Sequence, residues 1–121
     1  MRLPIYQIDA FAARLFAGNP AAVVPLDGAA GWPPDALMQS IAAENNLAET
    51  AFFLYRPGDT GPLPIRWFTP NLEIDLCGHA TVASAWVLFE RLEPGRSSVT
   101  FSSQSGPLSV ARDGAPLARD F

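Results

Sequence analysis

A nearly unbroken apolar segment, HATVASAWVLFER at residues 79–91, constrains the fold of this chain more than any other feature of its sequence. A helix on the surface of a domain carries one apolar stripe, whereas this segment would place apolar residues on almost every side of a helix. Ala80, Ala83 and Ser84 are small and share one face, so a neighbouring backbone can approach that face closely. We therefore predict a helix that is buried all round.

The rest of the sequence has mostly strand character. A second helix is predicted at residues 35–44, because Pro33 and Pro34 suit a helix start and Asn45 and Asn46 suit a helix end. Stretches rich in β-branched and aromatic residues predict strands at 3–11, 19–26, 51–56, 64–69, 99–103 and 107–112, with a further candidate at 116–121. Two helices and about six or seven strands predict an α+β domain.

Size, charge and composition exclude several classes of function. The chain has 121 residues and is 49% hydrophobic, which suits one domain with a genuine core. The net charge is −4 and the 8 basic residues are scattered, so neither nucleic acid nor a membrane surface is an expected partner. The N-terminal sequence lacks an apolar secretory core, and no apolar run reaches the ~20 residues that span a membrane. We expect a cytoplasmic protein.

The only cysteine and the only histidine, Cys77 and His79, lie where the predicted buried helix begins. Free N–H groups at a helix start favour a neutral imidazole and can bind a carboxylate, although a lone histidine can equally hydrogen-bond a nearby loop. The same position lowers the pKa of a thiol, yet a free cysteine is more often a small packing residue. One cysteine and one histidine supply at most half a metal site, so no metal is predicted.

Glu49 is the most informative carboxylate, because it stands at the entry to an otherwise apolar strand, in NLAETAFF at 46–53. Apolar surroundings favour the protonated carboxyl group, which is how a general acid/base near neutrality is made. A surface glutamate at a turn fits the local pattern equally well. We expect Glu73 and Asp75 to be solvated turn residues, and Glu44 to be solvated or hydrogen-bonded to a loop.

Four ordered blocks of the sequence resemble the phenazine-biosynthesis PhzF-like family of isomerases and epimerases. The blocks are IDAFAARLFAGNPAAVV (8–24), MQSIAAENNLAETAFF (38–53), RWFTPNLEIDLCGHATVASAWVL (66–88) and SGPLSVARDG (105–114). The resemblance implies a diaminopimelate-epimerase-like fold, in which a mostly antiparallel, barrel-like sheet wraps around a central buried helix, here at about 79–91. It also implies that residues 1–121 are a single domain equivalent to the N-terminal half of a two-domain protein, with the second domain absent.

The resemblance further implies cofactor-independent acid/base catalysis in a cleft between two domains, with no metal. Glu49 would carry a proton between carbons of a small-molecule substrate, and His79 would orient the substrate or assist the proton transfer. Cys77 occupies the place of a catalytic cysteine in related epimerases and would be a positional relic. The substrate-binding residues that the resemblance implies are Gly18, Asn19, Pro20 and Gly78.

Two other functions remain open from the sequence. The chain could be a truncated, catalytically incompetent domain that self-associates or binds a ligand, because the family's second domain supplies an aspartate and a glycine-rich loop. A homodimer or a separate chain would then cover the exposed domain face. The third reading is a racemase that uses Cys77. Ring-bearing and small amino-acid-like substrates both suit such a cleft, so the sequence identifies neither.

Overall fold

The computed structural model describes residues 3–10, 20–112 and 118–120. These residues form an 8-stranded sheet, two α-helices and a π-helical turn. In chain order the elements are β1 (Tyr6–Ala10), β2 (Pro20–Asp27), α1 (Asp35–Asn45), β3 (Glu49–Tyr55), β4 (Leu63–Phe68), β5 (Glu73–Ile74), α2 (Gly78–Val87), η2 (Leu88–Leu92), β6 (Ser98–Ser103), β7 (Gly106–Ala111) and β8 (Ala118–Asp120).

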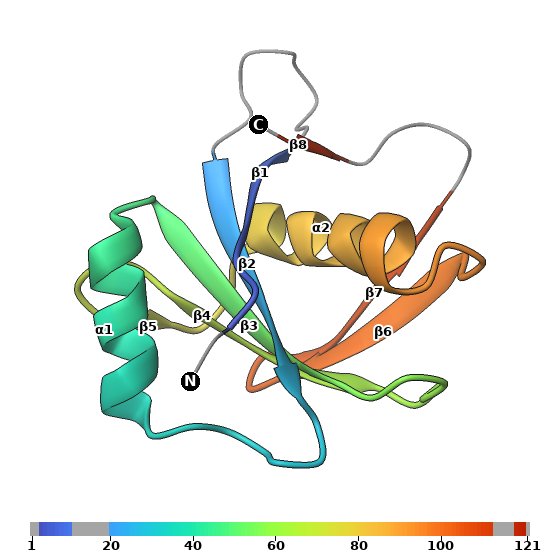
Figure 1. The fold of residues 1–121 in the computed structure, drawn as a ribbon, viewed down its shortest axis with the longest axis horizontal. Helices are drawn as coiled ribbons and strands as arrows, with labels where there is room; N and C mark the ends of the chain where they lie inside the picture. The colour runs from blue at the N-terminus through green and yellow to red at the C-terminus, as the bar shows by residue number, and fades with distance from the viewer. Residues whose placement is uncertain (1–2, 11–19, 113–117, 121) are drawn as a thin grey trace.

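The sheet curves around α2, with the strand order β7-β6-β4-β3-β2-β1-β8 and β5 paired to β4 (Figure 1). Most neighbouring strands are antiparallel, and the exceptions are the parallel pairs β2–β3 and β4–β6. The predicted α+β fold, a mostly antiparallel sheet around a central helix, is confirmed. None of the helices in the described ranges is long and apolar enough to cross a membrane.

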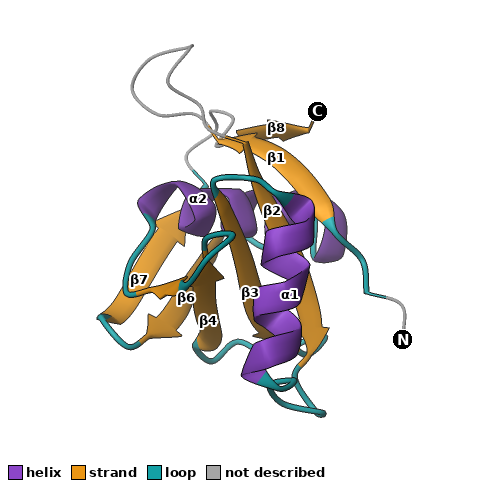
Figure 2. Ribbon diagram, turned by 90° about the vertical axis from the view of Figure 1, so that its left-hand side faces the viewer, coloured by secondary structure: helices purple, strands orange, loops and turns teal. Residues whose placement is uncertain are grey.

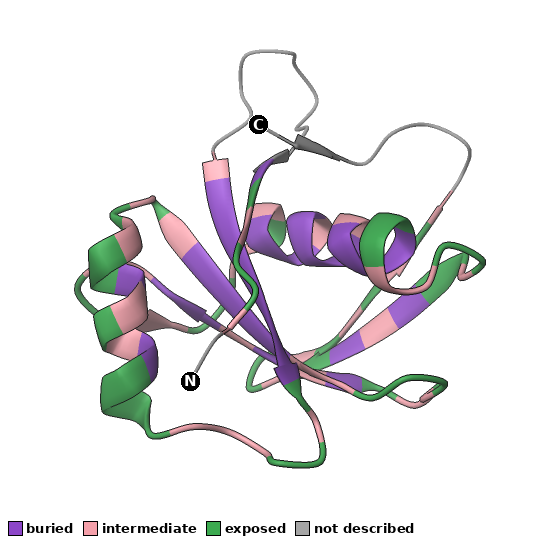
Figure 3. Ribbon diagram, viewed as in Figure 1, coloured by how far each residue is buried: buried purple, intermediate pink, exposed green. Residues whose placement is uncertain are grey.

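The main core lies between α2 and the concave face of the sheet. Ala80, Ala83 and Ala85 of α2 are fully buried, and their small side chains let the helix pack closely on β1, β2 and β3. Figure 3 shows the buried residues concentrated on α2 and the strands that face it. The strands contribute large side chains to this core, among them Val23, Phe53, Ile65, Trp67 and Phe101.

The convex face of the sheet is covered by α1 (Figure 2). Met38 and Ala42 of α1 form a second core with Phe52 and Phe68, whose rings meet edge to face at 5.4 Å. Because β2 and β3 are covered on both faces, their sequences are continuously apolar and do not alternate. These two central strands form the rigid support from which the candidate site is built.

The boundaries differ from the prediction in ways that have physical causes. The predicted helix at 79–91 is an α-helix only to Val87, and a π-helical turn replaces its last part. Val82 and Trp86 are half-buried, so the helix has one partly exposed side and is not buried all round. Strand β5 has only 2 residues, too few to produce a recognisable pattern. At the end of α1, Asn46 takes the predicted left-handed conformation, with φ 53°.

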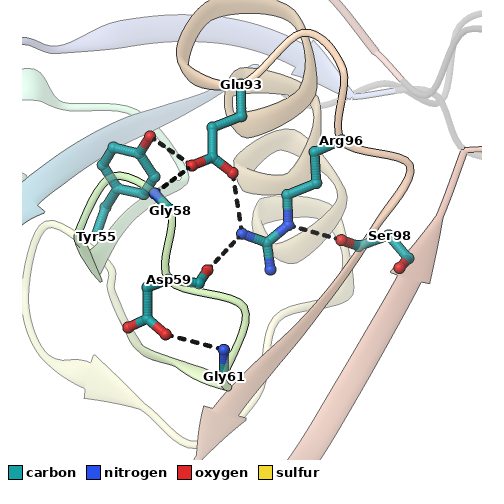
Figure 4. Close-up of polar contacts among 7 residues, drawn as sticks. All are labelled: Tyr55, Gly58, Asp59, Gly61, Glu93, Arg96 and Ser98. Carbon is teal, nitrogen blue, oxygen red and sulfur yellow. Dashed lines mark hydrogen bonds and ion pairs between the residues drawn. The ribbon is translucent and has the colours of Figure 1, made fainter.

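A polar network ties the loop after β3 to the turn that follows η2 (Figure 4). The Glu93 carboxylate accepts hydrogen bonds from the Tyr55 hydroxyl and the Gly58 N–H, each at 3.0 Å. Arg96 donates to Glu93 at 3.2 Å and to the Asp59 carbonyl at 2.9 Å. The network therefore fixes the C-terminal end of the α2–η2 helical segment, whereas Cys77 lies at its N-terminal end.

Candidate active site

Glu49 is held by the junction between α1 and the sheet. It is the first residue of β3, directly after the turn that ends α1, and it pairs with Ala21 in the parallel register of β2 and β3. Its neighbour Thr50 is fully buried, and its hydroxyl oxygen accepts a hydrogen bond from the Asn45 side-chain amide at 3.3 Å. The start of the strand is thus anchored, while the Glu49 side chain is half-buried.

Cys77 is held by the first turn of the central helix. It is the N-cap residue of α2, with an extended backbone at φ −147° and ψ 105°. Its carbonyl oxygen accepts hydrogen bonds from both the N–H and the hydroxyl of Thr81, at 3.1 and 2.7 Å. Thr81 is buried, so these bonds are shielded from water.

The structure brings the two anchored residues together. The Cys77 thiol donates a hydrogen bond to Oε1 of Glu49, with 3.5 Å between sulfur and oxygen, across a sequence separation of 28 residues. The segments NLAET and CGH therefore meet at the N-terminal end of α2. Cys77 also packs against the main core, as expected of a packing residue, but it makes a specific polar contact as well.

The helix start does not lower the pKa of the Cys77 thiol, because burial outweighs its effect. Burial raises the pKa of this thiol to about 11, and the charge of Glu49 and the hydrogen bond to it add to the increase. The backbone N–H groups of Ala80 and His79, at the helix start, lower the pKa but do not offset burial. Cys77 is consequently a protonated thiol near neutral pH and can act as a hydrogen-bond donor.

Three other predicted site residues, Gly78, His79 and Pro20, lie within the described residues. Gly78 and His79 open α2, and His79 is half-buried with no hydrogen-bond partner for its imidazole in the described part of the chain. A Cβ atom added at Gly78 would meet nothing within 4 Å, so the space in front of it is open. Pro20 begins β2, one residue before the partner of Glu49. Gly18 and Asn19 lie outside the described residues.

The sequence led us to expect that Glu73 and Asp75 are solvated, but in the structure both carboxylates accept hydrogen bonds from other side chains. Glu73 accepts two hydrogen bonds from Arg66, at 2.8 and 2.7 Å. Asp75 is exposed, but its side chain accepts a hydrogen bond from Gln104 and its carbonyl accepts one from Ser105, both at 2.8 Å. These contacts tie the segment before Cys77 to β4 and to the turn between β6 and β7.

Sequence reasoning missed two exposed leucines beside the site. Leu72 and Leu76 are each 54% exposed and lie on either side of β5, in the segment that leads to Cys77. A pocket of about 430 Å³ lies nearby between β4, β5 and β6, but neither Glu49 nor Cys77 lines it. Within the described ranges, no group of three or more His, Cys, Asp and Glu residues could hold a metal ion.

The fold defines a class of protein that is represented among solved structures. The chain superposes over 94% of its length on a PhzF family phenazine biosynthesis protein from Enterococcus faecalis, with TM-score 0.80 and 50% identity, covering 42% of that chain. A predicted epimerase from Pseudomonas aeruginosa matches 96% of this chain and 40% of its own, with TM-score 0.71 and 30% identity. The domain thus has the fold of PhzF proteins and of predicted epimerases.

The sequence comparison identifies the family. The profile of the phenazine biosynthesis-like proteins (PhzC-PhzF) matches residues 8–119, and this chain belongs to that family. An uncharacterized isomerase from Pseudomonas aeruginosa is 54% identical over 121 residues, which cover 100% of this chain and 44% of that protein. The chain therefore spans less than half the length of the curated relatives it matches.

Proposed function

We propose that this chain is an isomerase domain that moves a proton between carbons of a small carboxylate-bearing metabolite without a cofactor. Glu49 is the general acid/base. The observation that supports this most is the position of Glu49, half-buried and in contact with Cys77 at the N-terminal end of the central helix. A half-buried carboxylate beside a helix start, where N–H groups attract anions, suits proton transfer on an anionic substrate.

The proposed reaction balances with one carboxylate. Glu49 takes a proton from a carbon next to an electron-withdrawing group, and the electron pair of the broken C–H bond delocalises into that group. The neutral carboxylic acid then returns the proton to a different carbon, which restores the carboxylate. The enzyme ends the cycle unchanged, so no oxidant or reductant is consumed.

The Glu49–Cys77 contact offers one carboxylate for proton transfer within this chain, which supports isomerisation as the proposed reaction. The raised pKa of Cys77, about 11, also argues against a thiolate base and so against the cysteine-based racemase. A single group that works on one face delivers the proton to a neighbouring carbon on that face.

The first turn of α2 is the proposed binding site for the substrate carboxylate. The open space at Gly78 leaves room for a ligand beside the backbone N–H groups. His79 orients the substrate or assists the proton transfer, and Gly18, Asn19 and Pro20 contribute to the same end of the domain. Each of these roles is part of the proposal.

A second candidate function is ligand binding or self-association without turnover. Leu72 and Leu76 favour it, because two leucines with 54% exposure flank the site segment and offer an apolar surface to a partner. A homodimer or a separate chain would cover that surface. Light scattering combined with an activity assay distinguishes this candidate from the isomerase.

The proposal is tested by incorporation of solvent deuterium into carboxylate-bearing metabolites that have acidic C–H bonds. The protein should catalyse incorporation into at least one of them. Glu49→Gln should slow it by about a hundredfold or more, since removing a general base typically costs 10²–10⁴-fold. Glu44→Gln is the matched control, because it removes the same charge from an exposed position on α1. Undiminished incorporation by the Glu49→Gln protein would overturn the assignment.

A further inference from the structure

We propose that Cys77 is a positioning residue for Glu49: its thiol holds Oε1 of the carboxylate, so that Oε2 is the oxygen that takes the substrate proton. This inference rests on the proposed function of Glu49. It gives the cysteine a role distinct from packing and from thiol catalysis. Cys77 acts through Glu49 and does not itself exchange a proton with the substrate.

The two ends of the contact are fixed independently. The Cys77 backbone is held by two hydrogen bonds from the buried Thr81, and Glu49 is held by its place at the start of β3. The hydrogen bond of 3.5 Å between Sγ and Oε1 thus joins two rigid elements of the fold. Such a contact restricts rotation of the carboxylate, and a fixed orientation of a catalytic group accounts for a large part of its efficiency.

The contact also gives the two carboxylate oxygens of Glu49 different roles. Oε1 accepts the thiol hydrogen, while Oε2 has no hydrogen-bond partner among residues 3–10, 20–112 and 118–120. When Oε2 takes a proton, Oε1 becomes a carbonyl oxygen that still accepts from the thiol. The hydrogen bond therefore persists in both protonation states of Glu49, although it is stronger to the charged carboxylate.

A protonated thiol is required for this role, and the surroundings of Cys77 keep it protonated. Burial, the carboxylate of Glu49 and the hydrogen bond to it all raise the pKa of the thiol, against the opposing N–H groups of Ala80 and His79. Glu73, Asp75 and His79 are the other titratable side chains of its own segment. Glu49, on β3, is the only charged side chain within the described ranges that shifts the titration of the thiol.

The single cysteine allows the contact to be tested without knowledge of the substrate. Iodoacetamide reacts with the thiolate, forming the S–C bond and releasing iodide, so its rate reports on Cys77 alone. In the unmodified protein the rate should rise about tenfold per pH unit from about pH 7 to about pH 9.5 without a plateau. A plateau below about pH 9 would mean that the thiol is readily ionised, and would overturn the inference.

The variant Glu49→Gln should shift this profile to lower pH, because the negative charge beside the thiol is removed. We expect the rate near pH 8 to increase about threefold to tenfold, since the larger thiolate fraction is partly offset by weaker nucleophilicity. The control Glu44→Gln should leave the profile unchanged. Coincident profiles for all three proteins would show that Glu49 does not contact the thiol, whether or not Glu49 is catalytic.

A catalytic readout then tests the positioning role itself. In the deuterium-incorporation assay, Cys77→Ala should reduce the rate about fivefold to tenfold, roughly the value of one hydrogen bond, while Cys77→Ser keeps a donor and retains more activity. The pH dependence of incorporation should shift in Cys77→Ala and less in Cys77→Ser. Equal rates and pH profiles for the alanine, serine and unmodified proteins would overturn the role. Loss of activity in Glu49→Gln alone would still support the proposed function.

Discussion

The Cys77 thiol donates a hydrogen bond to Oε1 of Glu49 across 3.5 Å, and this contact joins the start of the central helix to the start of a central strand. It makes the N-terminal end of α2 a chemically organised position and not only the end of a buried helix. The side chains that support this position can be tested by single substitutions.

Thr81 should support the site through the backbone of Cys77. Thr81→Val removes the hydroxyl that donates to the Cys77 carbonyl at 2.7 Å, but keeps the shape and volume of the side chain. We expect the free energy of unfolding to fall by about 1–2 kcal/mol, because the bond is shielded from water. Urea unfolding measures this change. Thr60→Val, at an exposed loop position, should change stability by less than about 0.5 kcal/mol, and an equal effect at both positions would argue against the role of Thr81.

Ala83 should not tolerate a larger side chain. It is fully buried where α2 packs against the sheet, so Ala83→Leu would force the helix away from the strands. Overpacking of a dense core costs typically about 1–3 kcal/mol, and a comparable loss of stability is expected in thermal or urea unfolding. Ala43→Leu on the exposed side of α1 is the matched control and should be nearly neutral. A neutral Ala83→Leu protein would contradict the close packing of α2.

Arg66 should not be replaceable by lysine. Its guanidinium makes two hydrogen bonds to Glu73 and one to Asp35, and it lies 5.3 Å from the centre of the Trp32 ring. Lysine keeps the charge but loses the planar fork, so Arg66→Lys should destabilise the protein by about 1–2 kcal/mol in urea. The conservative exchange at the exposed Arg56 should have little effect. Equal stability of the two variants would show that only charge matters at residue 66.

The Glu93 network should make stability depend on pH. The hydrogen bond from Gly58 lowers the pKa of Glu93 below its ordinary value of 4.5, and Arg96 and Tyr55 contribute to the decrease. A lowered pKa in the folded state stabilises the protein above pH 4.5, and this contribution is lost as the pH falls through the native-state value. Glu93→Gln should therefore lower the Tm at pH 7 more than at pH 3. A deficit that is the same at both pH values would contradict the network's electrostatic role.

Tyr55, in the same network, should make stability decrease as the pH rises above about 10. Burial raises the pKa of Tyr55 above its ordinary value of 10.0, and the hydrogen bond to Glu93 adds to the increase. This contribution is present below pH 10 and is lost as the pH rises through the higher native-state value. Tyr55→Phe should show a Tm deficit that shrinks above pH 10. An unchanged deficit would indicate that the phenol contributes only through packing.

The sequence predicted those parts of the fold that follow from local patterns. The apolar run at 79–91 predicted a buried helix, because apolar residues on nearly every side of a helix require partners all round. It could not predict that the segment turns π-helical after Val87 or that Val82 and Trp86 are half-buried, since both depend on the strands around them. Strand β5, at Glu73–Ile74, forms only through its pairing with β4 and leaves no local signal.

The candidate site could be predicted only in part for the same reason. The positions of Glu49 and Cys77 at the starts of a strand and a helix follow from the sequence, but their contact depends on how α2 sits in the sheet. The helix start alone suggested a lowered thiol pKa for Cys77, whereas burial in the folded domain raises it. The pairing of Glu73 with Arg66 likewise arises from strand register, which local pattern does not specify.

The most direct test of the central claim follows a labelled proton through one turnover. A substrate identified by solvent exchange is prepared with deuterium at the carbon that loses its proton, and the product is analysed by mass spectrometry and NMR. If Glu49 alone carries the proton, part of the deuterium should appear at the new carbon, and Glu49→Gln should form product at least about a hundredfold more slowly. Product formed by the Glu49→Gln protein at the unmodified rate would contradict the account.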